Sequence, residues 1–161
     1  FLVVDSLMSY ISKISPTYKM PKYIVDKIEV SSEMKNRDND IEKGMNLLLD
    51  VQDLEMAYPK HHLQSDSLTR TPRVLCVSDS FYWGIYNMGV PRDVFNRGQF
   101  WFYNRKIFEE GKSPRMVNDI NVLREVEKHN LILLIATDAT LYKFAFGFID
   151  QLYELYQLSD K

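Results

Sequence analysis

The sequence lacks most of the patterns that would narrow its function quickly. It has one cysteine, Cys76, so no disulfide can form within the chain, and cysteine use does not indicate a compartment. No apolar run approaches the roughly 18–20 residues of a transmembrane helix, and no signal peptide is visible. Like charges do not cluster and the net charge is −2, which gives no support for nucleic-acid binding. No glycine-rich phosphate loop follows an expected strand, and no cofactor or metal is expected.

What is present suits a folded protein. The 161 residues fit a single domain, residues 1–161, and a hydrophobic content of 45% argues against disorder. The chain begins with Phe1 rather than Met, inside a segment whose apolar spacing predicts a helix over residues 2–14. We therefore expect this domain to be the C-terminal fragment of a longer chain.

Hydrophobic periodicity predicts short apolar strands that alternate with helices. Strands are expected at 73–78, 99–103 and 131–135, with 24–30 as a strand or short docking segment and 54–63 as an edge strand or extended arm. Helices are expected at 2–14, 40–49, 80–87, 92–96, 118–128 and 147–158. This alternation predicts an α/β fold with a three-layer, flavodoxin-like or SGNH-like parallel sheet. The number of strands is small, so the sheet is expected to be incomplete.

The most informative stretch is residues 73–83. Four apolar residues run into the small polar corner Ser78-Asp79-Ser80, and an aromatic, helix-compatible segment follows at once. Ligands of open α/β sheets bind at the carboxyl ends of the strands, beside the free amides of a helix start. Ser80 is therefore a candidate nucleophile whose oxyanion would be held by backbone amides. The alternative is a structural turn, since Ser and Asp are common N-cap residues.

Other side chains are expected at the same edge of the sheet. Asp138 follows the apolar strand 131–135 and would bind a sugar hydroxyl, or else only tighten its own loop. Tyr82 or Trp83 would line the pocket, although aromatic residues in such a segment are more often core.

A serine nucleophile also needs a base. The chain offers only His61, His62 and His129. His129 is expected at a solvated helix end. No Asp or Glu is placed to make an obvious dyad with His61 or His62. The base is therefore the weakest part of a catalytic interpretation.

Two runs together resemble a known superfamily. Residues 73–83, with Asp-Ser-Phe after an apolar strand, resemble the nucleophile block of the SGNH hydrolases, although Ser78 stands where glycine is usual. Residues 136–142 and 144–149 resemble the closing strand and helix of the branch that includes the alginate O-acetylation proteins. The resemblance covers roughly residues 73–158 and is greatest to uncharacterised, exported bacterial proteins of that branch.

The resemblance implies a Ser80 nucleophile and an Asp-x-His pair upstream of it. No Asp-x-His occurs in this chain, so the base is expected outside residues 1–161, unless the protein is a degenerate member. The first hypothesis is thus serine O-acyl transfer or ester hydrolysis on a glycan, and the second is a glycan- or partner-binding domain without chemistry. A periplasmic or cell-envelope location is implied by the resemblance alone. A truncated sheet would expose an edge, which predicts a homodimer through that edge.

Overall fold

The computed structural model describes residues 2–35, 45, 48 and 54–159, and it divides the chain into two compact units. The sheet unit contains residues 1–21 and 65–161, and the hairpin unit contains residues 22–64. The sequence predicted one domain over residues 1–161, so this division is a difference from that expectation. Most of the helix predicted at 40–49 lies outside the described residues.

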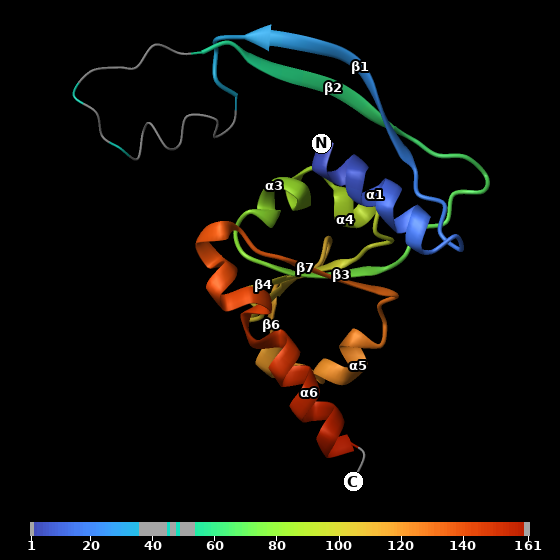
Figure 1. The fold of residues 1–161 in the computed structure, drawn as a ribbon, viewed down its shortest axis with the longest axis vertical. Coiled ribbons are helices and arrows are strands. Elements are labelled where there is room, and N and C mark those ends of the chain that lie inside the picture. The colour runs from blue at the N-terminus through green and yellow to red at the C-terminus, as the bar shows by residue number, and fades with distance from the viewer. Residues whose placement is uncertain (1, 36–44, 46–47, 49–53, 160–161) are drawn as a thin grey trace. The chain divides into compact units, whose positions relative to one another are not determined.

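The sheet unit is built on five strands with helices on both faces. The strands are β3 (Val74–Ser78), β4 (Gln99–Phe102), β5 (Lys106–Phe108), β6 (Arg115–Met116) and β7 (Leu131–Ile135). The helices are α1 (Leu2–Ile14), α3 (Tyr82–Asn87), α4 (Val90–Asp93), α5 (Val122–Val126) and α6 (Phe148–Ser159), with 3₁₀ segments η1 (Val117–Asp119) and η2 (Asp138–Gly147). In Figure 1, α1, α3 and α4 lie on one side of the sheet and α5 and α6 on the other.

The strand order is β6-β5-β4-β3-β7. The three strongly apolar strands β4, β3 and β7 run parallel, as predicted, whereas β5 and β6 are antiparallel additions. The sheet is therefore mixed, and the expectation of a purely parallel sheet is wrong. No strand was predicted between residues 103 and 118, because β5 and β6 are only three and two residues long, too short to show a hydrophobic period. Tyr103 and Asn104, both with positive φ, turn the chain from β4 into β5.

The core lies on both faces of β3, whose five residues are all buried. The face toward α5 and α6 holds one apolar cluster, which includes Leu75, Val77, Trp101 and Phe148. Helix α1 buries Val4, Met8 and Ile11 from one stripe and ends just before Pro16, as its apolar spacing predicted. No helix among the described residues is both long and apolar enough to cross a membrane.

The hairpin unit contains a two-stranded antiparallel sheet of β1 (Lys22–Ser31) and β2 (Met56–Gln64). Pro59 lies within β2, which is tolerated because each strand of a two-stranded sheet has a free edge. The extended conformation predicted for 24–30 and 54–63 is confirmed. Glu29 forms ion pairs with Lys27, Lys35 and Lys60 on this hairpin. Hydrogen bonds and charge from Lys60 and Lys35 lower the Glu29 pKa to about 2.

Candidate functional site

The corner between β3 and α3 changes from buried to exposed within three residues. Ser78 ends the strand with 0% exposure, Asp79 is 1% exposed, and Ser80 is exposed to solvent. Residues 74–77 are apolar and form the central strand, so the first residues after it lie at the carboxyl edge of the sheet. Ser80 thus lies at the carboxyl edge of the sheet, where the sequence predicted it, and it is exposed there.

Asp79 is the residue that holds this corner together. Its Oδ1 accepts a hydrogen bond from the Phe81 amide at 2.9 Å. Its Oδ2 accepts from the Thr137 amide at 2.9 Å, from Thr137 Oγ1 at 2.8 Å and from Thr140 Oγ1 at 2.5 Å. Burial by itself would raise the Asp79 pKa, but the hydrogen bonds from Thr140, Thr137 and Phe81 outweigh it and lower the pKa. A charged Asp79 therefore ties the end of β3 to the segment after β7.

The Ser80 hydroxyl has a different role from the Asp79 carboxylate. It makes no hydrogen bond to another residue in the part of the chain that the structure describes, and the Ser80 carbonyl accepts from the Trp83 amide at 3.1 Å. Backbone amides at this helix start were expected to hold an oxyanion, but the Phe81 amide already donates to Asp79. Any oxyanion donors at this corner must therefore be other groups.

The other predicted site residues are placed differently from one another. Asp138 is exposed, and its Oδ1 accepts from the adjacent Ala139 amide at 2.8 Å, which is the loop-tightening arrangement. Tyr82 is 1% exposed, with its ring centroid 4.8 Å from that of Phe100, so its side chain belongs to the core. Trp83 is half-buried, and its ring lies 4.6 Å from that of Phe108. Thr137 and Thr140 donate to Asp79 in the Ser80 corner, whereas the Asp138 carboxylate bonds only within its own loop among the described residues.

A cavity of about 750 Å³ opens at this edge of the sheet unit. Thr140 lines it and also donates to Asp79, so the cavity adjoins the corner that carries Ser80. The cavity is lined by Tyr103, Arg105, Thr140, Tyr142, Lys143, Phe144, Phe146, Gly147 and Asp150. Its wall is therefore rich in aromatic rings and carries both positive and negative side chains.

Two segments of unusual backbone form much of this wall. Tyr103 has φ 51° and Phe146 has φ 52°, and their rings meet edge to face at 5.0 Å. Residues 143–146 leave helical geometry in the middle of η2. Non-glycine residues with positive φ are costly and gather at binding sites more often than elsewhere. Neither Tyr103 nor Phe146 was a predicted site residue, since nothing in residue type reveals a positive φ at these positions.

No histidine of the sheet unit lies at this edge. His129 precedes β7, so it is at the amino end of the parallel strands, opposite Ser80. Its Nδ1 lies 2.8 Å from the Glu125 carbonyl oxygen, its Nε2 is buried without a described partner, and burial lowers its pKa. His129 therefore follows the end of α5, as expected, but its ring is half-buried rather than solvated.

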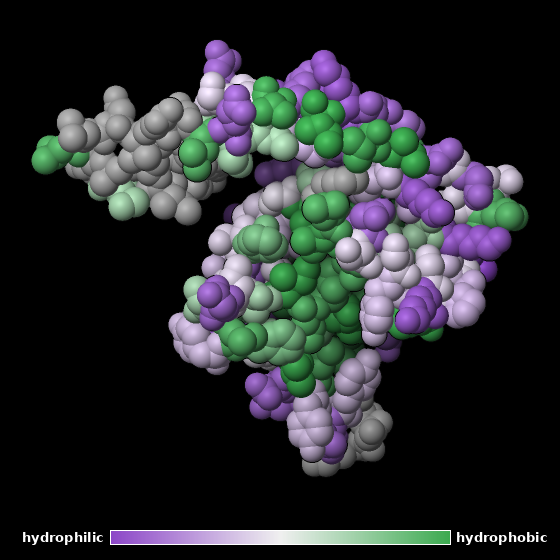
Figure 2. Space-filling view, turned by 45° about the horizontal axis from the view of Figure 1, so that its top comes forward, coloured by the Kyte–Doolittle hydropathy of each residue, from purple (hydrophilic) through white to green (hydrophobic). Residues whose placement is uncertain are grey.

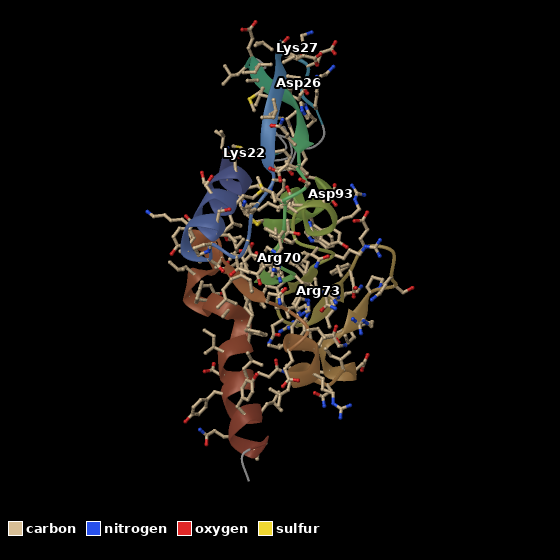
Figure 3. The ribbon with its side chains drawn as sticks, turned by 90° about the vertical axis from the view of Figure 1, so that its right-hand side faces the viewer. Lys22, Asp26, Lys27, Arg70, Arg73 and Asp93 are labelled. Atoms are coloured by element: carbon tan, nitrogen blue, oxygen red, sulfur yellow. The ribbon has the colours of Figure 1, made fainter. Side chains whose placement is uncertain are left out.

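The hairpin unit carries an Asp–His pair of its own. His62 Nδ1 lies 2.9 Å from Asp26 Oδ1 and 3.0 Å from Oδ2, and Figure 3 labels Asp26 on β1. The expectation that no acidic residue partners His61 or His62 is thus wrong for His62. The partners are 36 residues apart and meet only because β1 pairs with β2, which local spacing does not reveal.

A second polar cluster lies at the amino end of the strands. Gln99 is the first residue of β4, and its side-chain Nε2 donates to Glu109 Oε2 at 3.0 Å and to Glu125 Oε1 at 2.6 Å. Gln99 Oε1 accepts from the Trp101 indole at 2.9 Å. Four cationic side chains pair with the two carboxylates: Arg73, Lys112, Arg115 and Lys128. Figure 3 labels Arg73, which stands just before β3.

The comparisons with known proteins give no relative. No family model matches the chain, and neither a curated protein nor a solved structure matches it. Among the described residues, no three His, Cys, Asp or Glu side chains are placed together to hold a metal ion.

Proposed function

We propose that the carboxyl edge of the sheet unit is an acyl-transfer or ester-hydrolysis site acting on a glycan, with Ser80 as the nucleophile. The relationship to SGNH hydrolases and a periplasmic or cell-envelope location are part of this proposal, and both rest on the sequence resemblance. The observation that carries it is the contrast between Asp79, which is buried and fixed, and Ser80, which is exposed beside it.

The fixed corner supports the proposal because a nucleophile must be held in position before it reacts. Asp79 accepts four hydrogen bonds from three residues, so the backbone on both sides of it is restrained. Ser80 follows directly and keeps its hydroxyl in solvent. A turn that served only to begin α3 would not need a carboxylate anchored to Thr137 and Thr140, which are 58 and 61 positions away.

The proposed reaction has two steps. In the first, Ser80 Oγ forms a bond to the acyl carbon of an ester donor, the Ser80 proton passes to a base, and the donor alcohol leaves with a proton. In the second, a glycan hydroxyl or water attacks the acyl-serine and restores the Ser80 hydroxyl. We place the base outside residues 1–161, as the resemblance implies. His129 does not serve, since it lies at the amino end of the strands.

The adjoining cavity supports a glycan as the acceptor. Sugars stack their apolar faces on aromatic rings and hydrogen-bond to polar side chains. Tyr103, Tyr142 and Phe146 supply rings, and Arg105 and Asp150 supply hydrogen-bonding groups. A volume of about 750 Å³ lies within the usual range for small-molecule pockets, roughly 300–1,000 Å³.

The second candidate function is a glycan- or partner-binding domain with the same cavity and no acyl chemistry. Two observations favour it: the Phe81 amide is already bonded to Asp79, and no histidine of the sheet unit accompanies Ser80. The two functions share the cavity and differ only at Ser80.

The test measures hydrolysis of p-nitrophenyl acetate by the chain with added imidazole as an external base. Imidazole also reacts alone, so the quantity of interest is the difference between the chain and Ser80→Ala. Ser67→Ala, at an exposed serine before β3, is the matched control. The acyl-transfer proposal expects loss of the protein-dependent rate in Ser80→Ala only.

A protein-dependent rate that is equal in all three proteins would overturn the acyl-transfer proposal. Calorimetry with a neutral oligosaccharide such as cellohexaose, on the chain and on Tyr103→Ala, then tests the binding function. Binding that is lost in Tyr103→Ala supports a binding domain. Absence of binding by cellohexaose and by an acidic oligosaccharide such as a pectin fragment would remove that candidate too.

A further inference from the structure

The two edges of the five-stranded sheet are built in opposite ways. One edge is β6, which has two residues and follows Pro114. Its Arg115 forms ion pairs with Glu109 and Glu125. A short strand, a nearby proline and a charged side chain are the usual means by which proteins keep an edge from pairing with other chains.

The other edge is β7, and it has none of these protections. Its sequence is Leu131-Ile132-Leu133-Leu134-Ile135, without charge, proline or bulge, and among the described residues it pairs only with β3. Ile132 is 39% exposed and the other four residues are half-buried. β7 crosses the middle of the sheet unit in Figure 1, and Figure 2 shows apolar side chains gathered in the middle of that unit.

We propose that β7 pairs with β7 of a second copy of this chain, antiparallel and centred on Leu133. Two five-stranded sheets would then form one continuous sheet across a two-fold axis. In this register Leu131 faces Ile135 of the other copy, Ile132 faces Leu134, and Leu133 faces itself. Every cross-strand pair is aliphatic, and each pair lies on one face of the sheet, as antiparallel neighbours do.

The apolar character of the β7 edge favours a second copy of this chain as its binding partner. A strand added beside β7 would lie between the helix layers and must be apolar on both faces. β7 is itself apolar on both faces. Leu134 packs against the core cluster on the face toward α5 and α6, and Leu133 is the apolar residue on the opposite face. The other strands of this type, β3 and β4, already have partners on both sides. Among the described strands of the sheet unit, β7 thus has a free edge and is also apolar enough to pair with the free edge of a second copy.

The helices that cover the sheet would add to the buried surface. Exposed apolar or aromatic side chains lie along α6 at Ile149, Tyr153 and Tyr156, a spacing that places them on one stripe. A stable interface buries about 1,200–2,000 Å² in total, more than five-residue strands provide. Contacts from α6 are therefore expected in the dimer.

The test is sedimentation equilibrium of the chain over a range of concentrations, with Ile132→Lys and Met116→Lys. Met116 is 45% exposed on the guarded edge β6 and is the matched control. The chain and Met116→Lys should form dimers with similar dissociation constants. Ile132→Lys places a charge against Leu134 twice per dimer and should raise the dissociation constant about tenfold or more.

A second variant covers the case in which Ile132→Lys does not fold. Leu133→Cys is made together with Cys76→Ala, because Cys76 lies beside Leu133 in the sheet and could take the new thiol into a disulfide within the chain. This variant should form a disulfide dimer under mild oxidation, because the two Leu133 positions face each other in the proposed register. Dimers that persist in Ile132→Lys and are not cross-linked by Leu133→Cys would place the interface elsewhere and overturn the proposal. A monomer at all concentrations would overturn it as well. If hydrogen exchange then showed protected β7 amides, another segment of the same chain would cover the edge.

Discussion

The two ends of the parallel strands carry polar clusters that differ in their charge and in what they leave exposed. At the amino end, Gln99 bridges two buried glutamates, and four cations pair with them. At the carboxyl end, one aspartate accepts hydrogen bonds from neutral donors only, and a serine hydroxyl remains in solvent beside it. The carboxylates of the first cluster are paired with cations, whereas the second cluster leaves Ser80 exposed.

This difference agrees with our proposal, in which the amino end has a structural role and the carboxyl end carries the chemistry. The charged groups at the amino end partner one another, so little is left there to bind a ligand. The carboxyl end adjoins the cavity of about 750 Å³, and part of its wall holds an unfavourable backbone conformation. Variants at the amino end should therefore change stability alone, and variants that break the hydrogen bonds of Asp79 at the carboxyl end should change both stability and any activity that depends on Ser80.

The largest stability effect is expected at Gln99. Gln99→Met keeps the side-chain volume but removes the hydrogen bonds to Glu109, Glu125 and Trp101. Polar groups left buried without partners should lower the free energy of unfolding by about 2–4 kcal/mol. Urea denaturation with an unchanged m-value measures this loss. A loss below the error of that method would show that the bridge contributes little.

Asp79 is expected to come next. Asp79→Asn removes the charge that accepts from Phe81, Thr137 and Thr140, and should cost about 2 kcal/mol. Thr140→Val removes one donor and should cost about half as much. The same urea experiment measures both. Unlike Gln99→Met, Asp79→Asn should also reduce the Ser80-dependent rate. An equal rate in the two variants would contradict the view that only the carboxyl end of the strands supports activity.

Acid should weaken the amino end through Glu125. Burial would raise its pKa, but hydrogen bonds from Lys128 and Gln99 and the charges of Lys128 and Arg115 lower it from 4.5 to about 2. A lowered pKa stabilises the folded state above pH 4.5, and this contribution is lost as the pH falls toward 2. The loss should be about 1–3 kcal/mol. Urea midpoints at several pH values measure it, and Glu125→Gln should flatten the dependence; an unchanged slope would contradict the assignment.

The smallest effect is expected at Ser78. Its hydroxyl is buried and has no hydrogen-bond partner among the described residues. Ser78→Ala removes the unpaired oxygen and should raise the free energy of unfolding by up to about 1 kcal/mol, without reducing the Ser80-dependent rate. Thermal denaturation measures the change. A clear loss of stability would mean that the hydroxyl has a partner in solution.

The sequence predicted the parts of the fold that depend on long apolar runs. Residues 74–78, 99–102 and 131–135 are strands because each is apolar on both faces, and α1 and α6 are helices because their apolar positions follow a helical period. The strands β5 and β6 were missed because they are too short for any pattern. The division into two units was missed because it depends on long-range contacts between β1 and β2.

The candidate site was predicted in outline and not in detail. The two polar corners after β3 and β7 pointed to one edge of the sheet, and the hydrogen bonds of Asp79 join them. The residues that donate to Asp79 are Thr137 and Thr140, and Asp138 does not take part. Which of these side chains reaches Asp79 depends on the backbone conformation at the start of η2, which the sequence does not reveal. The Asp26–His62 pair likewise depends on the hairpin register, which residue spacing alone does not fix.

The central claim is that Ser80 carries an acyl group. Its most direct test is mass spectrometry of peptides from the chain after treatment with p-nitrophenyl acetate and imidazole, compared with Ser67→Ala and Ser80→Ala. Our account predicts an acetyl ester on Ser80 in the chain and in Ser67→Ala, which forms and then decays. Acetylation spread over lysines, with none on Ser80, would contradict it.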